Sequence, residues 1–88
     1  MNTIEQRIRS GAAKIVDVRS RGEFMGGHVA GSINIPLQEI PERLDELKQL
    51  SDIILCCASG NRSAQATSFL KAQGLECENG GSWMDVNF

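Results

Sequence analysis

The residues in this sequence best suited to chemistry are three cysteines and one arginine. Cys56 and Cys57 are adjacent, Cys77 stands apart, and four residues separate Cys57 from Arg62. A thiolate is a strong nucleophile, and a guanidinium supplies a permanent positive charge with planar donors for oxyanions. An odd cysteine count with an adjacent pair is no disulfide framework. One His and no C-x-x-C spacing predict no metal site.

The segment that follows Cys57 has the composition of an anion cradle. Small residues let the backbone curl with its N–H groups inward, and a helix starting near Arg62 or Ser63 adds its positive dipole end. Such surroundings lower a cysteine pKa from ~8.5 into the range ~3.5–7.5. We therefore expect Cys57 to be a nucleophile, with Ala58, Ser59 and Gly60 curling around its sulfur and Arg62 supplying positive charge.

The other two cysteines are interpreted as core residues. Neighbouring side chains of a strand point to opposite faces, so only one of Cys56 and Cys57 faces the loop, and the loop begins at Cys57. A cysteine that follows an apolar strand is usually a small hydrophobic core residue. We assign that role to Cys56, and a structural role to Cys77.

Alternating strand and helix patterns must position this loop. Strands are expected at 14–18, 32–35 and 53–56, with a shorter one at 76–79 and a turn at Gly80-Gly81. Helical patterns cover 4–9 and 63–73, and the apolar stripe between Leu37 and Leu50 predicts one amphipathic helix. Residues 23–27 form a loop or a short helix. The pattern predicts an α/β fold, with a mainly parallel sheet of four to five strands and helices on both faces.

Length and charge limit the function classes. The 88 residues suffice for a single domain over 1–88, and we expect a monomer. A net charge of −2 argues against nucleic-acid and anionic-membrane partners. No apolar run reaches the ~20 residues that span a bilayer, and the first residues do not resemble a secretory signal. The chain as written is expected in the cytoplasm, or in the periplasm if Met1 stands in place of a native signal peptide.

Four motifs in the expected order resemble the rhodanese homology domain. The C-A-S-G-N-R-S loop at 57–63 is similar to that family's C-x-x-G-x-R-S active-site loop. D-V-R at 17–19 with Glu23-Phe24, G-H-V-A-G-S-I-N-I-P at 27–36 and G-G-S-W at 80–83 resemble its other signatures. Each motif alone would be weak, but together they cover nearly the whole chain and are highly specific.

The resemblance implies transfer of sulfane sulfur through a persulfide on Cys57. Carried onto this chain, the resemblance implies that thiosulfate or another small anionic donor binds through Arg62 and a backbone cradle made of Ala58, Ser59, Gly60, Asn61, Arg62 and Ser63. The acceptor would be cyanide, a thiol or a protein. No metal or organic cofactor is implied. The remaining motif residues are assigned to structure: Asp17 bonds backbone near its strand end, Arg19 pairs with Glu23, and His28 and Trp83 pack.

Three other functions were weighed against this one. Cysteine phosphatases resemble C-x-x-x-x-x-R, with a longer loop than the one between Cys57 and Arg62. Mercaptopyruvate sulfurtransferases resemble C-G-[ST]-G-V-[TS] and lack the arginine. A regulatory or sulfur-delivery module that binds a partner is the third alternative, and it does not exclude an enzyme.

Overall fold

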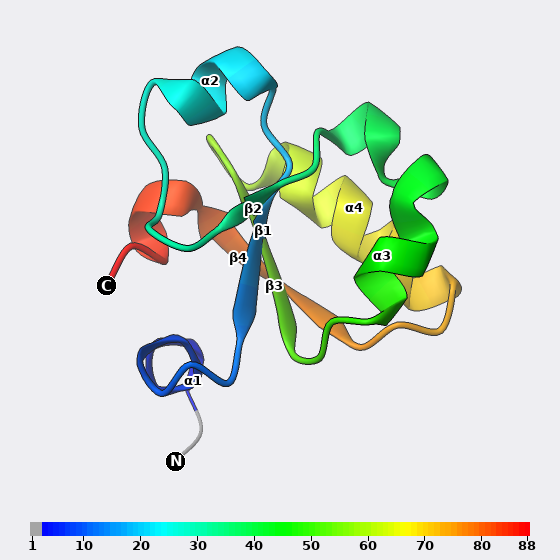
Figure 1. The fold of residues 1–88 in the computed structure, drawn as a ribbon, viewed down its shortest axis with the longest axis horizontal. Helices are drawn as coiled ribbons and strands as arrows, with labels where there is room; N and C mark the ends of the chain where they lie inside the picture. Colours follow the sequence, from blue (N-terminus) through cyan, green and yellow to red (C-terminus); the bar gives the residue numbers. More distant parts are fainter. Residues whose placement is uncertain (1–2) are drawn as a thin grey trace.

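A four-stranded parallel sheet forms the centre of the computed structural model, which describes residues 3–88. Its strands are β1 (Lys14–Asp17), β2 (Ile33–Asn34), β3 (Ile53–Cys57) and β4 (Cys77–Ser82), in the order β2-β1-β3-β4. Parallel neighbours cannot be joined by tight hairpins, so helical segments connect them and cover the sheet (Figure 1). The expected α/β class with a parallel sheet is confirmed, with four strands.

Helices cover both faces of the sheet, as expected. They are α1 (Ile4–Arg9), α2 (Arg21–Met25), α3 (Leu44–Lys48) and α4 (Asn61–Ala72), together with the 3₁₀ helices η1 (Leu37–Glu39), η2 (Pro41–Arg43) and η3 (Trp83–Asp85). Side chains of α3 and α4 pack on one face, and side chains of α1 and η3 pack on the other. No helix within residues 3–88 is both long and apolar enough to cross a membrane.

The prediction of one amphipathic helix between Leu37 and Leu50 is wrong. The segment forms η1, η2 and α3 in succession instead of one continuous helix. Pro41 has no N–H to donate to the preceding turn, and its ring clashes with a continuing helix. The apolar stripe itself was read correctly, because Ile40 and Leu47 are buried and Leu37 packs beside them.

The turn predicted at Gly80-Gly81 is also wrong, because both glycines lie inside β4. Leu55 of β3 pairs with Asn79 and Cys56 with Gly81, which leaves Gly80 as the extra residue of a β-bulge. A Cβ on Gly80 would lie 2.8 Å from side-chain atoms of Ile54 in β3 and of Val86, which follows η3. Bulges kink an edge strand and re-aim its side chains, and β4 is an edge strand.

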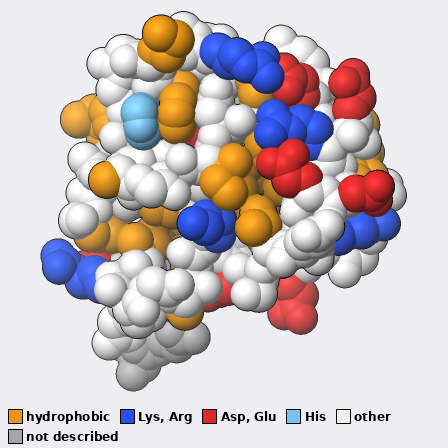
Figure 2. All heavy atoms as spheres, in the orientation of Figure 1, with side chains coloured by type: hydrophobic (Ala, Val, Ile, Leu, Met, Phe, Trp, Pro, Cys, Tyr) orange, Lys and Arg blue, Asp and Glu red, His pale blue; other side chains and the backbone are white. Residues whose placement is uncertain are grey.

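Charged side chains of both signs are interspersed on the molecular face in Figure 2. The surface ion pairs include a chain in which Glu39 contacts Arg21 and Arg43, and Arg43 also contacts Glu46. Exposed pairs of this kind contribute only ~0–1 kcal/mol each to stability. This face therefore carries no broad field of one sign.

Candidate active site

The loop after β3 is short because α4 begins at Asn61, two residues earlier than the sequence pattern predicts for its first residue. Gly60 precedes the helix with φ +96°, a left-handed conformation that side chains rarely adopt. A Cβ there would also lie 3.3 Å from the backbone of Gly81. The turn therefore requires glycine on two grounds. It brings the first turn of α4 back over the end of β3.

The sulfur of Cys57 lies at the floor of this loop and accepts three hydrogen bonds. The backbone N–H of Gly60 donates to Sγ at 3.0 Å, and the N–H and the hydroxyl of Ser63 both donate at 3.4 Å. Burial by itself raises the pKa of the Cys57 thiol. Hydrogen bonds from Ser63, and from the N–H groups of Ser59 and Gly60, outweigh burial and lower this pKa below its ordinary value. The geometry favours a thiolate.

The neighbouring Cys56 has the opposite environment. Its side chain is fully buried in the cluster with Ile15 and Ile54, whereas Cys57 belongs to the cluster on the other face of the sheet. Burial, followed by the nearby charge of Asp17, raises the pKa of Cys56 to about 12. The prediction that Cys56 is a core residue is confirmed. The two adjacent thiols therefore differ: the surroundings of Cys57 stabilise its thiolate, and those of Cys56 keep its thiol neutral.

Asn79 braces the loop from β4, and the sequence reading assigned it no role. Its Oδ1 accepts the Ser63 hydroxyl at 2.7 Å and the N–H of Gly81 at 3.0 Å. Its Nδ2 donates to the carbonyl of Gly60 at 3.2 Å. The signal that could have found it is its place at the end of the short strand predicted over 76–79, because sites in open α/β sheets form beyond the carboxyl ends of strands.

Arg62, the residue expected to bind an anionic donor, is occupied by a carboxylate of this chain. Its Nη1 and Nη2 donate to Glu23 Oε1 and Oε2 at 2.7 and 3.0 Å, a bidentate pair. Arg62 and the N–H of Ser20 together lower the pKa of Glu23 to about 2, so this carboxyl is ionised at neutral pH. The sequence reading missed the pair because it matched Glu23 with Arg19.

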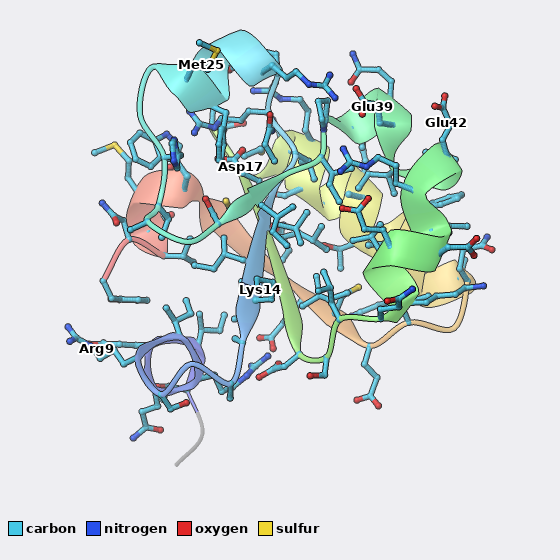
Figure 3. The ribbon with its side chains drawn as sticks, in the orientation of Figure 1. Arg9, Lys14, Asp17, Met25, Glu39 and Glu42 are labelled. Carbon is cyan, nitrogen blue, oxygen red and sulfur yellow. The ribbon has the colours of Figure 1, made fainter. Side chains whose placement is uncertain are left out.

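Arg19 instead forms a buried ion pair with Asp17 at 2.7 Å, so the predicted pair between Arg19 and the Glu23 carboxylate is wrong. Asp17 also accepts the backbone N–H of Arg19, in agreement with its predicted contact near the strand end. Arg19 reaches the carbonyls of Glu23 and Gly27, and its guanidinium lies 4.7 Å from the Trp83 ring centre. Figure 3 shows Asp17 close to α2. This buried cation therefore fastens α2 to the sheet.

The packing predicted for Trp83 is confirmed, because its side chain lies against the buried cluster on the face of the sheet that α1 covers. His28 stacks on Phe24 with ring centres 3.8 Å apart, and its Nδ1 lies 2.7 Å from the Phe24 carbonyl oxygen. Both contacts agree with the structural role expected for His28. Among residues 3–88, no group of three or more His, Cys, Asp or Glu side chains is arranged to hold a metal ion.

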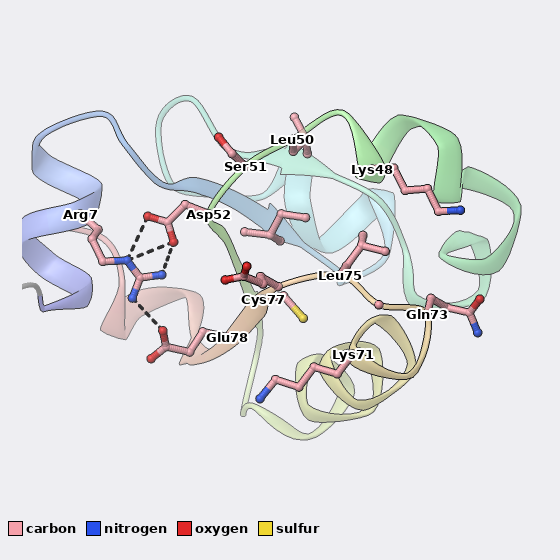
Figure 4. Close-up of a pocket in the computed structure, with 13 residues that line it drawn as sticks. Arg7, Lys48, Leu50, Ser51, Asp52, Lys71, Gln73, Leu75, Cys77 and Glu78 are labelled. Atoms are coloured by element: carbon pink, nitrogen blue, oxygen red, sulfur yellow. Dashed lines mark hydrogen bonds and ion pairs between the residues drawn. The ribbon is translucent and has the colours of Figure 1, made fainter.

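A separate groove of about 1050 Å³ lies at the other end of the sheet (Figure 4). It adjoins the amino ends of β3 and β4 at Ile53 and Cys77, whereas Cys57 ends β3. Arg7 on its wall is held by Asp52 and by Glu78. Burial raises the pKa of the Cys77 thiol, which favours its neutral form. The loop thus surrounds its thiol with groups that lower the pKa, and the groove does not.

The sequence matches the family model of the rhodanese-like domain over residues 1–83. It is 36% identical to the uncharacterized protein YqhL of Bacillus subtilis over 80% of this chain and 57% of that protein. It is 35% identical to the thiosulfate sulfurtransferase PspE of Escherichia coli over 81% of this chain and 71% of that protein. The chain spans about half the length of several curated relatives that it matches, YqhL among them.

Solved structures resemble the fold closely. A rhodanese-related protein from Thermoplasma volcanium superposes with a TM-score of 0.79 and 32% identity, covering 97% of this chain and 90% of the other. The match extends across the sheet and its helices, so the arrangement of loop and strands is shared with a known group of proteins.

Proposed function

The chain belongs to the rhodanese-like domain family, and from this premise we propose that it is a sulfurtransferase that carries sulfane sulfur as a persulfide on Cys57. One observation supports the proposal above all. The Cys57 sulfur accepts hydrogen bonds from Gly60 and Ser63, in a loop whose pKa effects favour a thiolate. Relatives named as thiosulfate sulfurtransferases support the same reaction class.

The proposed reaction has two nucleophilic steps. The Cys57 thiolate attacks the outer sulfur of thiosulfate, the sulfur–sulfur bond of the donor breaks, and sulfite leaves with the electron pair. A persulfide anion remains on Cys57. Cyanide then attacks the terminal sulfur and leaves as thiocyanate, which restores the Cys57 thiolate. A thiol acceptor, in place of cyanide, takes the same sulfur and becomes a persulfide. Charge balances in each step, and the donor step needs no general base.

The cradle of residues 58–63 is proposed to hold the anions that arise in both steps. The donors at Gly60 and Ser63 are fixed before the reaction, so a negative charge on sulfur needs little reorganisation. Cys57 has no exposed surface in this conformation, whereas Ala58 and Ser59 are exposed above it. Binding of a donor at the Cys57 sulfur therefore requires the loop to widen.

Arg62 is proposed to bind the oxygen atoms of thiosulfate or another small anionic donor. Its guanidinium presents two parallel donors, and it must exchange the Glu23 carboxylate for the donor to use both. The acceptors proposed are cyanide, a cellular thiol or a protein. A relative named as a thiosulfate:glutathione sulfurtransferase makes a thiol acceptor reasonable to test first.

Mass spectrometry of protein treated with thiosulfate tests the proposal. We expect the protein to gain the mass of one sulfur atom, located on Cys57, and to lose it on addition of cyanide. Cys57→Ser should gain nothing, and Cys77→Ser, which removes a thiol outside the loop, should behave as the unchanged protein. Absence of the sulfur adduct would contradict the proposal, and hydrolysis of an aryl phosphate by the same protein would favour phosphatase chemistry instead.

A further inference from the structure

The contact between Arg62 and Glu23 joins the start of α4 to α2 across the mouth of the loop. Both side chains are about one-third exposed, at 36% and 39%, so solvent and small anions can reach the pair. Arg62 is also close enough to Cys57 for the charge of that thiolate to act on it. The carboxylate covers Nη1 and Nη2 with one oxygen each. Those are the two atoms that a sulfonate or sulfinate group would use.

Glu23 is held in place by contacts other than Arg62. It is the third residue of α2, where its Oε1 accepts the backbone N–H and the hydroxyl of Ser20, both at 3.0 Å. Its own N–H donates to Ser20 Oγ at 3.2 Å, which completes a capping box. The Glu23 carbonyl accepts the buried guanidinium of Arg19. A donor that displaces the carboxylate from Arg62 leaves a fixed negative charge beside itself.

We propose that Glu23 determines which sulfur donors the site accepts, by neutralising Arg62 and so disfavouring dianions relative to donors with at most one negative charge. This inference rests on the proposed sulfur transfer and names the preferred donor class as the persulfide of a small thiol. Thiosulfate brings two charges toward a neutral ion pair. A persulfide R–S–SH brings no negative charge, or one when it is ionised. The Cys57 thiolate forms a bond to its outer sulfur, the sulfur–sulfur bond of the donor breaks, and the thiolate RS⁻ leaves.

The test compares two donors in single-turnover formation of the Cys57 persulfide. The donors are thiosulfate and the persulfide of 2-mercaptoethanol, whose hydroxyethyl group carries no charge. In Glu23→Gln, which keeps a capping-box residue, we expect the ratio of the two rate constants to shift about tenfold toward thiosulfate. Glu23→Asp keeps the charge and should restore most of the discrimination. Glu39→Gln breaks a similar surface pair with Arg21 and should leave the ratio unchanged.

Calorimetric titration with sulfite tests the same inference without any sulfur transfer. In mildly alkaline buffer sulfite is mainly a dianion and has no sulfane sulfur to donate, and Glu23→Gln should bind it about tenfold more tightly than the unchanged protein does. An unchanged affinity for sulfite, or a donor ratio that does not move, would overturn the assignment of Glu23. If neither donor forms a persulfide, the proposed function fails, whereas the sulfite titration still decides the role of Glu23.

Discussion

The Ser63→Ala variant isolates one of the three hydrogen bonds that hold the Cys57 sulfur. It removes the hydroxyl at 3.4 Å and keeps the backbone N–H of residue 63. A hydrogen bond to a charged group contributes ~1.5–3 kcal/mol, and one pKa unit corresponds to about 1.4 kcal/mol, so the upper bound is ~1–2 units. The hydroxyl has one proton, which the Asn79 oxygen at 2.7 Å also accepts. We therefore expect the Cys57 pKa to rise by about 0.5–1 unit.

Ultraviolet absorbance of the thiolate, followed against pH, measures this change, and Cys57→Ser identifies the contribution of Cys57. Ser59→Ala is the matched control, because Ser59 contributes its backbone N–H, which alanine keeps. An unchanged pKa in Ser63→Ala, or an equal rise in Ser59→Ala, would refute the role given to the hydroxyl.

The same substitution has a consequence for stability with a definite sign. A thiol whose pKa is lowered by folding stabilises the folded state above its unfolded pKa of ~8.5, and this stability is lost as pH falls through the folded pKa. Ser63→Ala weakens part of that contribution. Its loss of unfolding free energy in urea should therefore be larger at about pH 9 than at about pH 6.

The remaining predictions concern stability and are measured by urea denaturation. Asp17→Asn leaves a buried guanidinium without its charge partner and should cost about 3–5 kcal/mol, whereas Glu39→Gln on the surface should have a much smaller effect. Gly80→Ala should destabilise by about 1–3 kcal/mol because its Cβ meets packed side chains at 2.8 Å. Gly22→Ala, in α2 with open space around it, should stabilise by about 0.5–1 kcal/mol. Cys56 stays neutral in the folded state, where its pKa is about 12, but ionises above ~8.5 in the unfolded state, so the unfolding free energy should fall by up to about 1.4 kcal/mol per pH unit above ~8.5. Cys56→Ala should reduce that slope, and equal slopes would contradict the burial of Cys56 as a neutral thiol.

The local arrangement around Cys57 could be predicted from the sequence because it depends on neighbours in the chain. An apolar run ended by a cysteine and followed by small residues allows few structures, and the observed strand, loop and helix are among them. Strand alternation also separated Cys56 from Cys57 correctly. Proline favours a first helical position, which is where Pro41 lies in η2, but the apolar stripe that continues across it favoured a single helix.

The partner of Arg62 could not be predicted in this way. Glu23 lies 39 residues earlier, and the two meet only because α2 is fastened over the carboxyl end of the sheet by the buried Arg19. Asn79 depends similarly on the bulge at Gly80. These contacts arise from tertiary packing, to which hydrophobic periodicity and motif spacing are insensitive.

Because Cys56 and Cys57 lie on opposite faces of β3, the sheet separates two sulfur atoms that are adjacent in sequence. If an oxidant converts Cys57 to a sulfenic acid, the Cys56 thiol cannot react with it to form a disulfide unless β3 separates from the sheet. Damage and repair at Cys57 then depend on thiols from solution. Reagents selective for acidic thiols should therefore mark one member of this pair and spare the other.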